Sequence, residues 1–330
     1  MAFQADQAQR GTECMPDACA VTTVFGVDLH AEVELPFLSG ALASPTGRRL
    51  KMRVADSDHV GDSGWLAGAA LLCDQREADG SVAFQIEAHP DAGFRIWGPA
   101  HGVHLLSGDG RRLSSFPNGS PPEAWQRLLV AQVLPFAATL QGLEVFHAGA
   151  VVLDGRALAL AGPSGAGKTS VAVELCRQGA DFLADDVLAL ERSDGELLAH
   201  PGAPLAGIDH AEMQRLSGLD ARPPHETLAV NARERLVRMP SVSSPVALGG
   251  LFFLERLPDG PPEPRFEPLS DAQPLLMATF NFVLSTPQRL LGLLEVCALV
   301  AQHRVERVLF GPTSDASQVG TAIRRRLDRG

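Results

Sequence analysis

Short apolar runs that alternate with polar positions fill the first third of the chain. The alternation is clearest in Phe84-Gln85-Ile86 and in Phe94-Arg95-Ile96-Trp97, and Gly, Pro and Asp residues separate the runs. A repeat of two residues is typical of strands with one buried face. We therefore expect residues 1–120 to form a small β-rich N-terminal module.

A helix is predicted directly after this module, behind a turn-rich linker. Ser120 and Glu123 have the spacing of a capping box, with Pro121 as the first helical residue. Pro135 would kink or end this helix, because proline lacks the N–H that the helix interior needs. We place the second domain at 121–330.

Two apolar runs separated by Asp154-Gly155 open the central part of the chain. The runs cover residues 150–153 and 156–161. Asp-Gly between apolar runs is a strong signal for a tight β-hairpin. The second run should therefore have an antiparallel neighbour.

A helix and a strand are predicted after this hairpin. Apolar residues at helical spacing cover 169–178, and Gly179 is a suitable C-terminal cap. The run 182–184 then predicts a strand that ends at Asp185-Asp186. This order of elements indicates an α/β nucleotide-binding domain.

The remainder of the chain continues the mixed pattern. Residues 250–254 and 305–310 have the apolar character of strands, and 275–300 and 316–327 have helical spacing, with an interruption near Pro287. The fold class predicted for the whole chain is therefore α/β with a β-rich N-terminal module.

Composition limits the location of the protein. The chain has 330 residues, 45% of them hydrophobic and 20% charged, which is typical of one large or two modest globular domains. No apolar run approaches the length of about 18 residues that a membrane span needs. The first residues also lack the basic start and apolar run of a signal peptide. We expect a cytoplasmic protein without membrane contact.

Charge and cysteine content exclude two further classes. A formal net charge of -11 argues against nucleic acid as a partner, since phosphate backbones are bound mainly through Lys and Arg. The cysteines are odd in number and lack paired spacing, so neither a disulfide framework nor a zinc ribbon is expected. They are Cys14, Cys19, Cys73, Cys176 and Cys297.

A P-loop follows the predicted hairpin, and it carries the clearest chemistry of the chain. Its glycines allow backbone N–H groups to turn toward an anion, Lys168 can reach the β- and γ-phosphates, and the Thr169 hydroxyl can bind magnesium. Lysine occurs only twice in the chain, at Lys51 and Lys168. We expect ATP, or a close nucleotide relative, and Mg²⁺ as cofactors. The residues assigned to nucleotide binding are Gly162, Pro163, Ser164, Gly165, Ala166, Gly167, Lys168, Thr169 and Ser170.

The acid pair Asp185-Asp186 is the second candidate feature. At the carboxyl end of a strand in a parallel sheet, both carboxylates would lie beside the P-loop. One could hold magnesium while the other accepts the proton of an incoming hydroxyl. The alternative is a solvated turn, but Val187 and the residues after it resume the apolar pattern at once and favour the functional interpretation.

Histidine and arginine residues give weaker signals. His147 lies fifteen positions before Gly162 and could fold back toward the phosphates, or it could be a packing residue. Arg233, Arg235 and Arg238 are clustered. One of them could clamp the transferring phosphoryl group, with a surface stripe as the simpler alternative.

The order histidine, hairpin, P-loop, helix and Ala-Asp-Asp resembles the catalytic domain of HPr kinase/phosphorylase, a serine kinase fold related to phosphoenolpyruvate carboxykinase. The match covers about residues 147–190. The resemblance implies that Asp185 is the general base, Lys168 a phosphate ligand, Thr169 a metal ligand and His147 an active-site residue. Asp186 is then left as the metal-holding carboxylate.

The chain departs from that family after the acid pair. The family has a Glu-x-Arg-Gly-x-Gly signature there, whereas residues 204–213 read PLAGIDHAEM. Phosphorylase activity and HPr as a substrate are therefore not expected, and Asp209 and Glu212 are the conceivable second metal ligands. The chain is more similar to the HPr-kinase-related proteins encoded beside peptide-tailoring genes, including lasso-peptide kinases.

The function predicted from the sequence is an ATP- and magnesium-dependent kinase with a hydroxyl acceptor, a serine of a peptide or small protein. One alternative is a nucleotide-regulated binding protein without transfer activity, and another is a small-molecule kinase. The family's rings keep a homo-oligomer among the open alternatives.

Overall fold

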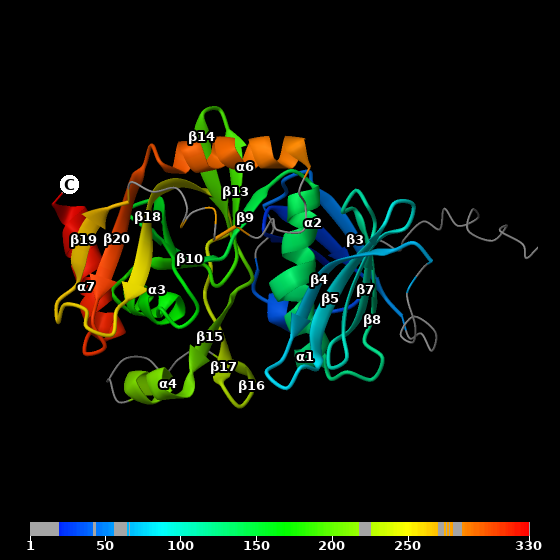
Figure 1. Cartoon of the computed structure of the whole chain (residues 1–330), viewed down its shortest axis with the longest axis horizontal. Coiled ribbons are helices and arrows are strands. Elements are labelled where there is room, and N and C mark those ends of the chain that lie inside the picture. Colours follow the sequence, from blue (N-terminus) through cyan, green and yellow to red (C-terminus); the bar gives the residue numbers. More distant parts are fainter. Residues whose placement is uncertain are drawn as a thin grey trace, which may run out of the picture.

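A computed structural model describes residues 20–41, 44–55, 65, 67–217, 226–269, 274, 276, 278–279 and 286–329. Cys14 and Cys19 lie outside the described residues, and so does most of the first part of the helix predicted over 275–300. The described residues form a mixed α/β structure with three sheets and fewer helices than strands (Figure 1).

An eight-stranded sheet forms the N-terminal part, in agreement with the alternating pattern there. Its spatial order is β1-β2-β3-β8-β7-β6-β5-β4, and β3 is parallel to both β2 and β8 while the other pairs are antiparallel. The strands are β1 (Ala20–Val24), β2 (Val27–Ala31), β3 (Arg49–Val54), β4 (Ala70–Arg76), β5 (Val82–His89), β6 (Gly93–Gly98), β7 (Gly102–Leu106) and β8 (Arg112–Phe116). A single 3₁₀ turn, η1 (Pro36–Leu38), lies between β2 and β3.

One long helical segment follows this sheet and begins one residue later than predicted. Its parts are α1 (Pro122–Leu128), a π-helical turn η2 (Leu129–Val133) and α2 (Leu134–Leu140). The predicted capping box is wrong. Pro121 is the N-cap and has an extended ψ of 152°, because the following proline disfavours the helical conformation of the residue before it. Pro135 does not end the segment, since the π turn before it accommodates the missing N–H.

Helices α1 and α2 lie between the first sheet and the rest of the molecule (Figure 1). Their apolar residues share one buried cluster with the inner face of the first sheet, including Leu129, Phe136, Leu50 and Ile96. The predicted domain boundary at residue 120 stays a prediction.

A nine-stranded sheet holds the centre of the second half. Its main order is β12-β10-β11-β18-β14-β13-β9, with β20 beside β18 and β19 beside β20. The strands are β9 (Glu144–Phe146), β10 (Ala148–Leu153), β11 (Arg156–Ala161), β12 (Asp181–Ala184), β13 (Leu188–Ser193), β14 (Glu196–His200), β18 (Val246–Arg256), β19 (Arg265–Pro268) and β20 (Arg304–Phe310).

The predicted hairpin is confirmed, and it changes how the acid pair reaches the P-loop. Asp154 and Gly155 both have positive φ, as a type I′ turn requires, and β10 is antiparallel to β11. Strand β12 pairs antiparallel with β10, so β11 and β12 run in the same direction with β10 between them. Their carboxyl ends therefore share one edge, although the neighbour of β12 is antiparallel and not parallel as expected.

The remaining helices cover the second sheet. α3 (Lys168–Arg177) follows β11 and ends before Gly179, whose φ is +99°. α6 (Pro287–Val300) and α7 (Ala316–Asp328) are the C-terminal helices, and their predicted positions are confirmed within the described residues. Figure 1 shows α3 and α7 close together beside β10, β18 and β20.

A small third sheet lies below the gap between the two larger sheets in Figure 1. It contains β15 (Leu205–Asp209), β17 (Glu234–Arg238) and β16 (Thr227–Val230), in the order β15-β17-β16. α4 (His210–Ser217) continues directly from β15.

Over the part of the chain that the structure describes, no helix has both the length and the apolar character needed to cross a membrane.

Candidate active site

The loop between β11 and α3 carries the P-loop sequence, and glycine is required at its start. Gly162 has a φ of +145°, and a Cβ atom built there would lie 2.4 Å from the carbonyl oxygen of Leu254. The loop thus passes too close to β18 for any side chain. Gly165 and Gly167 also have left-handed backbones, with φ of +80° and +91°.

The N-terminus of α3 opens onto this loop without a side-chain cap. Its N-cap residue is Gly167, which has no side chain to accept a hydrogen bond from the first turn. The first N–H groups of a helix have no partner within the helix, so those of Lys168, Thr169 and Ser170 are suited to an anion. The geometry of this loop and helix is compatible with the phosphate cradle predicted from the sequence.

Lys168 folds back over the loop. Its Nζ donates to the carbonyl oxygens of Gly162 at 3.0 Å and of Pro163 at 3.4 Å. The residue is buried, and burial lowers the pKa of its ammonium group. A phosphate in the loop would offer this ammonium charged oxygens in place of neutral carbonyls.

Asp185, at the end of β12, is in direct contact with the P-loop helix. Its Oδ1 accepts from the Thr169 hydroxyl at 2.8 Å, and its Oδ2 accepts from the backbone N–H of Gly207 at 3.0 Å. Burial, and secondly the negative charge of Asp186, raise the pKa of Asp185 to about 7. A carboxyl group with that pKa can exchange a proton near neutral pH, which is what a general base requires.

Asp186 and His147 are the next candidate residues. Asp186 has a left-handed backbone with φ of +59°. The Nδ1 of His147 lies 3.0 Å from the carbonyl oxygen of Asp186. Since a carbonyl only accepts, Nδ1 carries the proton. Burial and the charge of Lys168 lower the pKa of His147, so its Nε2 is unprotonated at neutral pH.

A cleft of about 260 Å³ lies over the P-loop and brings most of the predicted residues together. Asp209 and Arg233 line it as well. Two other members of those predicted sets are paired elsewhere: Glu212 pairs with Arg215, and Arg238 pairs with Glu226. The lining residues are Arg127, His147, Ser164, Gly165, Gly167, Lys168, Thr169, Ser170, Asp186, Gly207, Asp209, Arg233 and Glu234.

The oxygen atoms beside the P-loop fit magnesium. The Thr169 hydroxyl and the Asp185 and Asp186 carboxylates are hard oxygen ligands, which Mg²⁺ prefers. Among the described residues, no group of three or more His, Cys, Asp and Glu side chains is arranged to hold a metal. That is compatible with magnesium, which commonly uses one or two carboxylates together with substrate phosphates and water.

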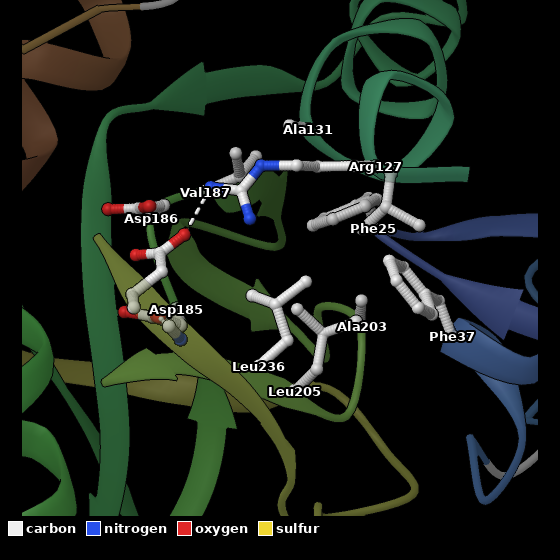
Figure 2. Close-up of a pocket in the computed structure, with 13 residues that line it drawn as sticks. Phe25, Phe37, Arg127, Ala131, Asp185, Asp186, Val187, Ala203, Leu205 and Leu236 are labelled. Atoms are coloured by element: carbon white, nitrogen blue, oxygen red, sulfur yellow. Dashed lines mark hydrogen bonds and ion pairs between the residues drawn. The ribbon is translucent and has the colours of Figure 1, made fainter. Parts of the chain in front are cut away.

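Arg127 and Glu234 are site residues that the sequence analysis missed. Arg127 extends from α1 and forms an ion pair with Glu234 of β17, so two distant parts of the chain meet at the acid pair (Figure 2). Gly207, whose N–H holds Asp185, comes from β15. No local motif marks these residues, because they come from three separate segments.

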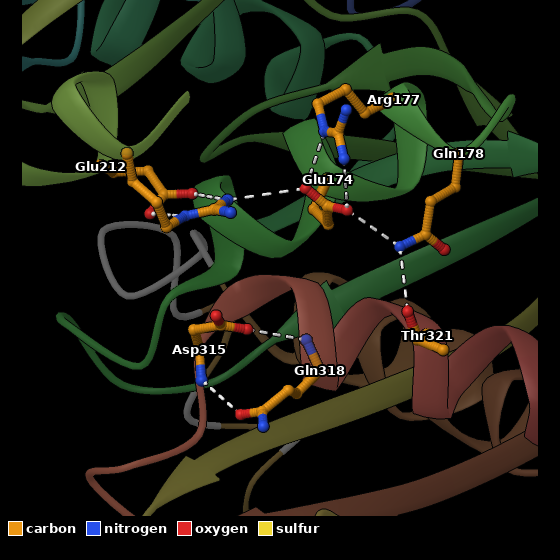
Figure 3. A network of polar contacts seen from close by, with 8 residues as sticks. Glu174, Arg177, Gln178, Glu212, Asp315, Gln318 and Thr321 are labelled. Carbon is orange, nitrogen blue, oxygen red and sulfur yellow. Dashed lines mark hydrogen bonds and ion pairs between the residues drawn. The ribbon is translucent and has the colours of Figure 1, made fainter. Parts of the chain in front are cut away.

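A polar network around the buried Glu174 anchors the C-terminal half of α3 (Figure 3). Glu174 is 1% exposed, accepts from Arg177 and Gln178, and pairs with Arg215 of α4 at 3.5 Å. Gln178 also donates to Thr321 of α7. The helix that carries Lys168 and Thr169 is thereby tied to both α4 and α7.

Comparison with known proteins gives little direct information. No protein-family model matches the chain, and no curated protein sequence matches it. A solved structure titled "Structure of the Hpr(Ser) kinase/phosphatase from Coxiella burnetii" is similar at 15% identity and a TM-score of 0.30, over 56% of this chain and 97% of that chain. A similarity this distant does not assign the chain to a family, so the function has to be inferred from the site.

Proposed function

We propose that the protein is an ATP- and magnesium-dependent phosphotransferase that acts on a hydroxyl group, namely a serine of a peptide or small protein. The observation that carries the proposal is the contact between Asp185 and Thr169, 2.8 Å apart. It joins the first turn of an uncapped P-loop helix to a carboxylate whose pKa is about 7. A phosphate cradle and a general base are thus within one hydrogen bond of each other.

Each group would have a defined role in transfer. The loop N–H groups and Lys168 hold the phosphates, while Thr169 and Asp186 offer oxygen ligands to magnesium, which when bound neutralises charge on the phosphate oxygens. Asp185 takes the proton of the acceptor hydroxyl. The acceptor oxygen then bonds to the γ-phosphorus as the bond to the β-phosphate oxygen breaks, and ADP leaves.

His147 and Arg233 flank the same cleft. A neutral His147 offers Nε2 as a hydrogen-bond acceptor, and Arg233 can balance negative charge that remains on the phosphoryl group. His147 and Arg233 can act in this way only if they contact the nucleotide, so both roles depend on how the phosphates are oriented in the loop.

The proposal is tested by incubating the purified protein with γ-labelled ATP and magnesium, together with pools of peptides and of small metabolites. We expect label on a serine-containing peptide, with no transfer by Asp185→Asn. Label on a metabolite alone would favour the small-molecule kinase. ATP binding without any labelled product would favour the nucleotide-regulated binding protein and refute transfer.

A further inference from the structure

A second, smaller cavity lies beside the acid pair and adjoins the phosphate cleft. Its volume is about 60 Å³, and Asp185 lines it but does not line the phosphate cleft. The proposed general base therefore opens onto this cavity. Asp186, Gly207, Arg127 and Glu234 line both spaces, so the cavity and the cleft are neighbours.

The floor of the small cavity is apolar. Figure 2 shows the rings of Phe25 and Phe37 on one side and Ala203, Leu205 and Leu236 below. An apolar cavity of about 150 Å³ can hold benzene, so 60 Å³ holds roughly two or three carbon atoms. That is the size of a valine side chain, and the single methyl group of alanine also fits.

Arg127 supplies the one unpaired donor of this cavity. Its Nη2 pairs with Glu234, while its Nη1 is buried and has no hydrogen-bond partner. Figure 2 shows the guanidinium between the acid pair and the two phenylalanine rings. A buried donor without a partner costs free energy, so a ligand oxygen here would be stabilised.

The charges around Arg127 decide what kind of oxygen fits. Glu234 already balances the guanidinium, and Asp185 and Asp186 add negative charge beside it. A second carboxylate would be repelled, whereas a neutral carbonyl oxygen accepts from Nη1 without that penalty.

We infer that this cavity, defined by Phe25, Phe37, Ala131, Leu236 and Arg127, is the acceptor subsite. It takes a short aliphatic side chain next to the reacting serine, while a backbone carbonyl oxygen of the acceptor binds Arg127 Nη1. The inference rests on the proposed function and names its substrate class as peptides in which Ala or Val adjoins serine. The serine hydroxyl then lies at Asp185, facing the phosphate cleft.

Transfer to a peptide set tests this directly. Seven-residue peptides would carry one serine with Gly, Ala, Val or Phe on either side of it. We expect kcat/KM for the Ala or Val peptides to exceed that for Gly and Phe about tenfold, the usual range for one apolar group in a fitted pocket. Equal values for all four neighbours would overturn the inference.

Pocket-filling variants provide a matched comparison. Ala131→Leu adds three carbon atoms to the cavity wall and should remove the Val preference while leaving the KM for ATP unchanged. Ala78→Leu adds the same atoms at an exposed position after β4 and should change neither. Arg127→Gln should raise the peptide KM about tenfold and raise it more than the KM for ATP, although Arg127 also borders the phosphate cleft. A purely structural role of Arg127 would instead raise both KM values equally.

A binding measurement separates this inference from the proposed function. Saturation-transfer NMR with N-acetyl-valine N-methylamide needs no catalysis, and the probe carries an isopropyl group and neutral carbonyls. We expect transfer to its methyl groups with the wild type and with Ala78→Leu, and at least threefold less with Ala131→Leu. This pattern without any phosphotransfer would refute the kinase but retain the pocket. Equal signals from all three proteins would refute the pocket.

Discussion

Replacing Asp185 by Asn tests the general base through stability as well as activity. In the folded protein, burial and Asp186 raise the pKa of Asp185 from 3.8 to about 7. Between these values the folded state holds a proton that the unfolded chain has lost, so stability falls as pH rises from about 4 toward 7. The difference between these two pKa values corresponds to about 4 kcal/mol of unfolding free energy.

Asp185→Asn removes this titration and leaves a constant cost. The amide has to face two donors, the Thr169 hydroxyl and the Gly207 N–H, and its own NH₂ group meets one of them. That mismatch costs about 1–3 kcal/mol at every pH. Relative to wild type, the variant should therefore gain about 2–3 kcal/mol of stability between pH 5 and pH 8.

Urea unfolding at pH 5, 6, 7 and 8 measures the difference, with Asp181→Asn at the exposed start of β12 as the matched control. The control should follow wild type at each pH. If the free energy of unfolding changed with pH in the same way for wild type and Asp185→Asn, the pKa of Asp185 would not be raised. The reason to call it a general base would then be lost. Transfer activity retained by the variant would remove that role as well.

Three further changes have defined outcomes. Gly162→Ala should abolish nucleotide binding and destabilise the fold by about 2–4 kcal/mol in urea unfolding, because the new Cβ atom would lie 2.4 Å from a backbone oxygen. Gly165→Ala is the control. It has open space around it and should cost only about 1–2 kcal/mol in the same assay. Glu174→Gln should cost about 3 kcal/mol in the same assay, since it leaves Arg177 without its buried anion and removes one of the two carboxylates beside Arg215. A cost below 0.5 kcal/mol would contradict the anchoring role. His147→Gln should keep nucleotide binding in calorimetry and lower kcat about tenfold or more. An unchanged kcat would show that His147 is a packing residue without a role in transfer.

The local elements of the second half could be predicted from sequence because short-range chemistry specifies them. Asp154-Gly155 forces the hairpin through its positive φ angles, and Gly179 ends α3. Strand β12 ends at the acid pair as its apolar run indicates. In each case the residues that decide the structure are neighbours in the chain.

The pairing of strands that are distant in the chain could not be predicted from the sequence. Strand β18 pairs parallel with β11 and supplies the Leu254 carbonyl that makes Gly162 obligatory, but nothing in either run specifies the partner. The start of α1 was misassigned because two adjacent prolines compete with the capping box at Ser120.

The site could be predicted only where it is contiguous. The P-loop was predicted from its motif, and the roles of Asp185 and His147 were implied by the family resemblance. The structure brings Lys168, Thr169, Asp186 and His147 to one cleft. The Arg127 to Glu234 ion pair joins helix α1 to the third sheet. Such a pair depends on tertiary packing, so neither residue carries a signal in its own segment.

Calorimetric titration with magnesium and adenylyl imidodiphosphate tests the central claim most directly. Wild type should bind one nucleotide, and Lys168→Ala should bind at least tenfold more weakly, because it loses a charge-assisted contact worth about 1.5–3 kcal/mol. Lys51→Ala, at the other and exposed lysine, should bind like wild type. Absence of binding to wild type, or equal affinity of all three proteins, would contradict a phosphate cradle at Gly162–Thr169.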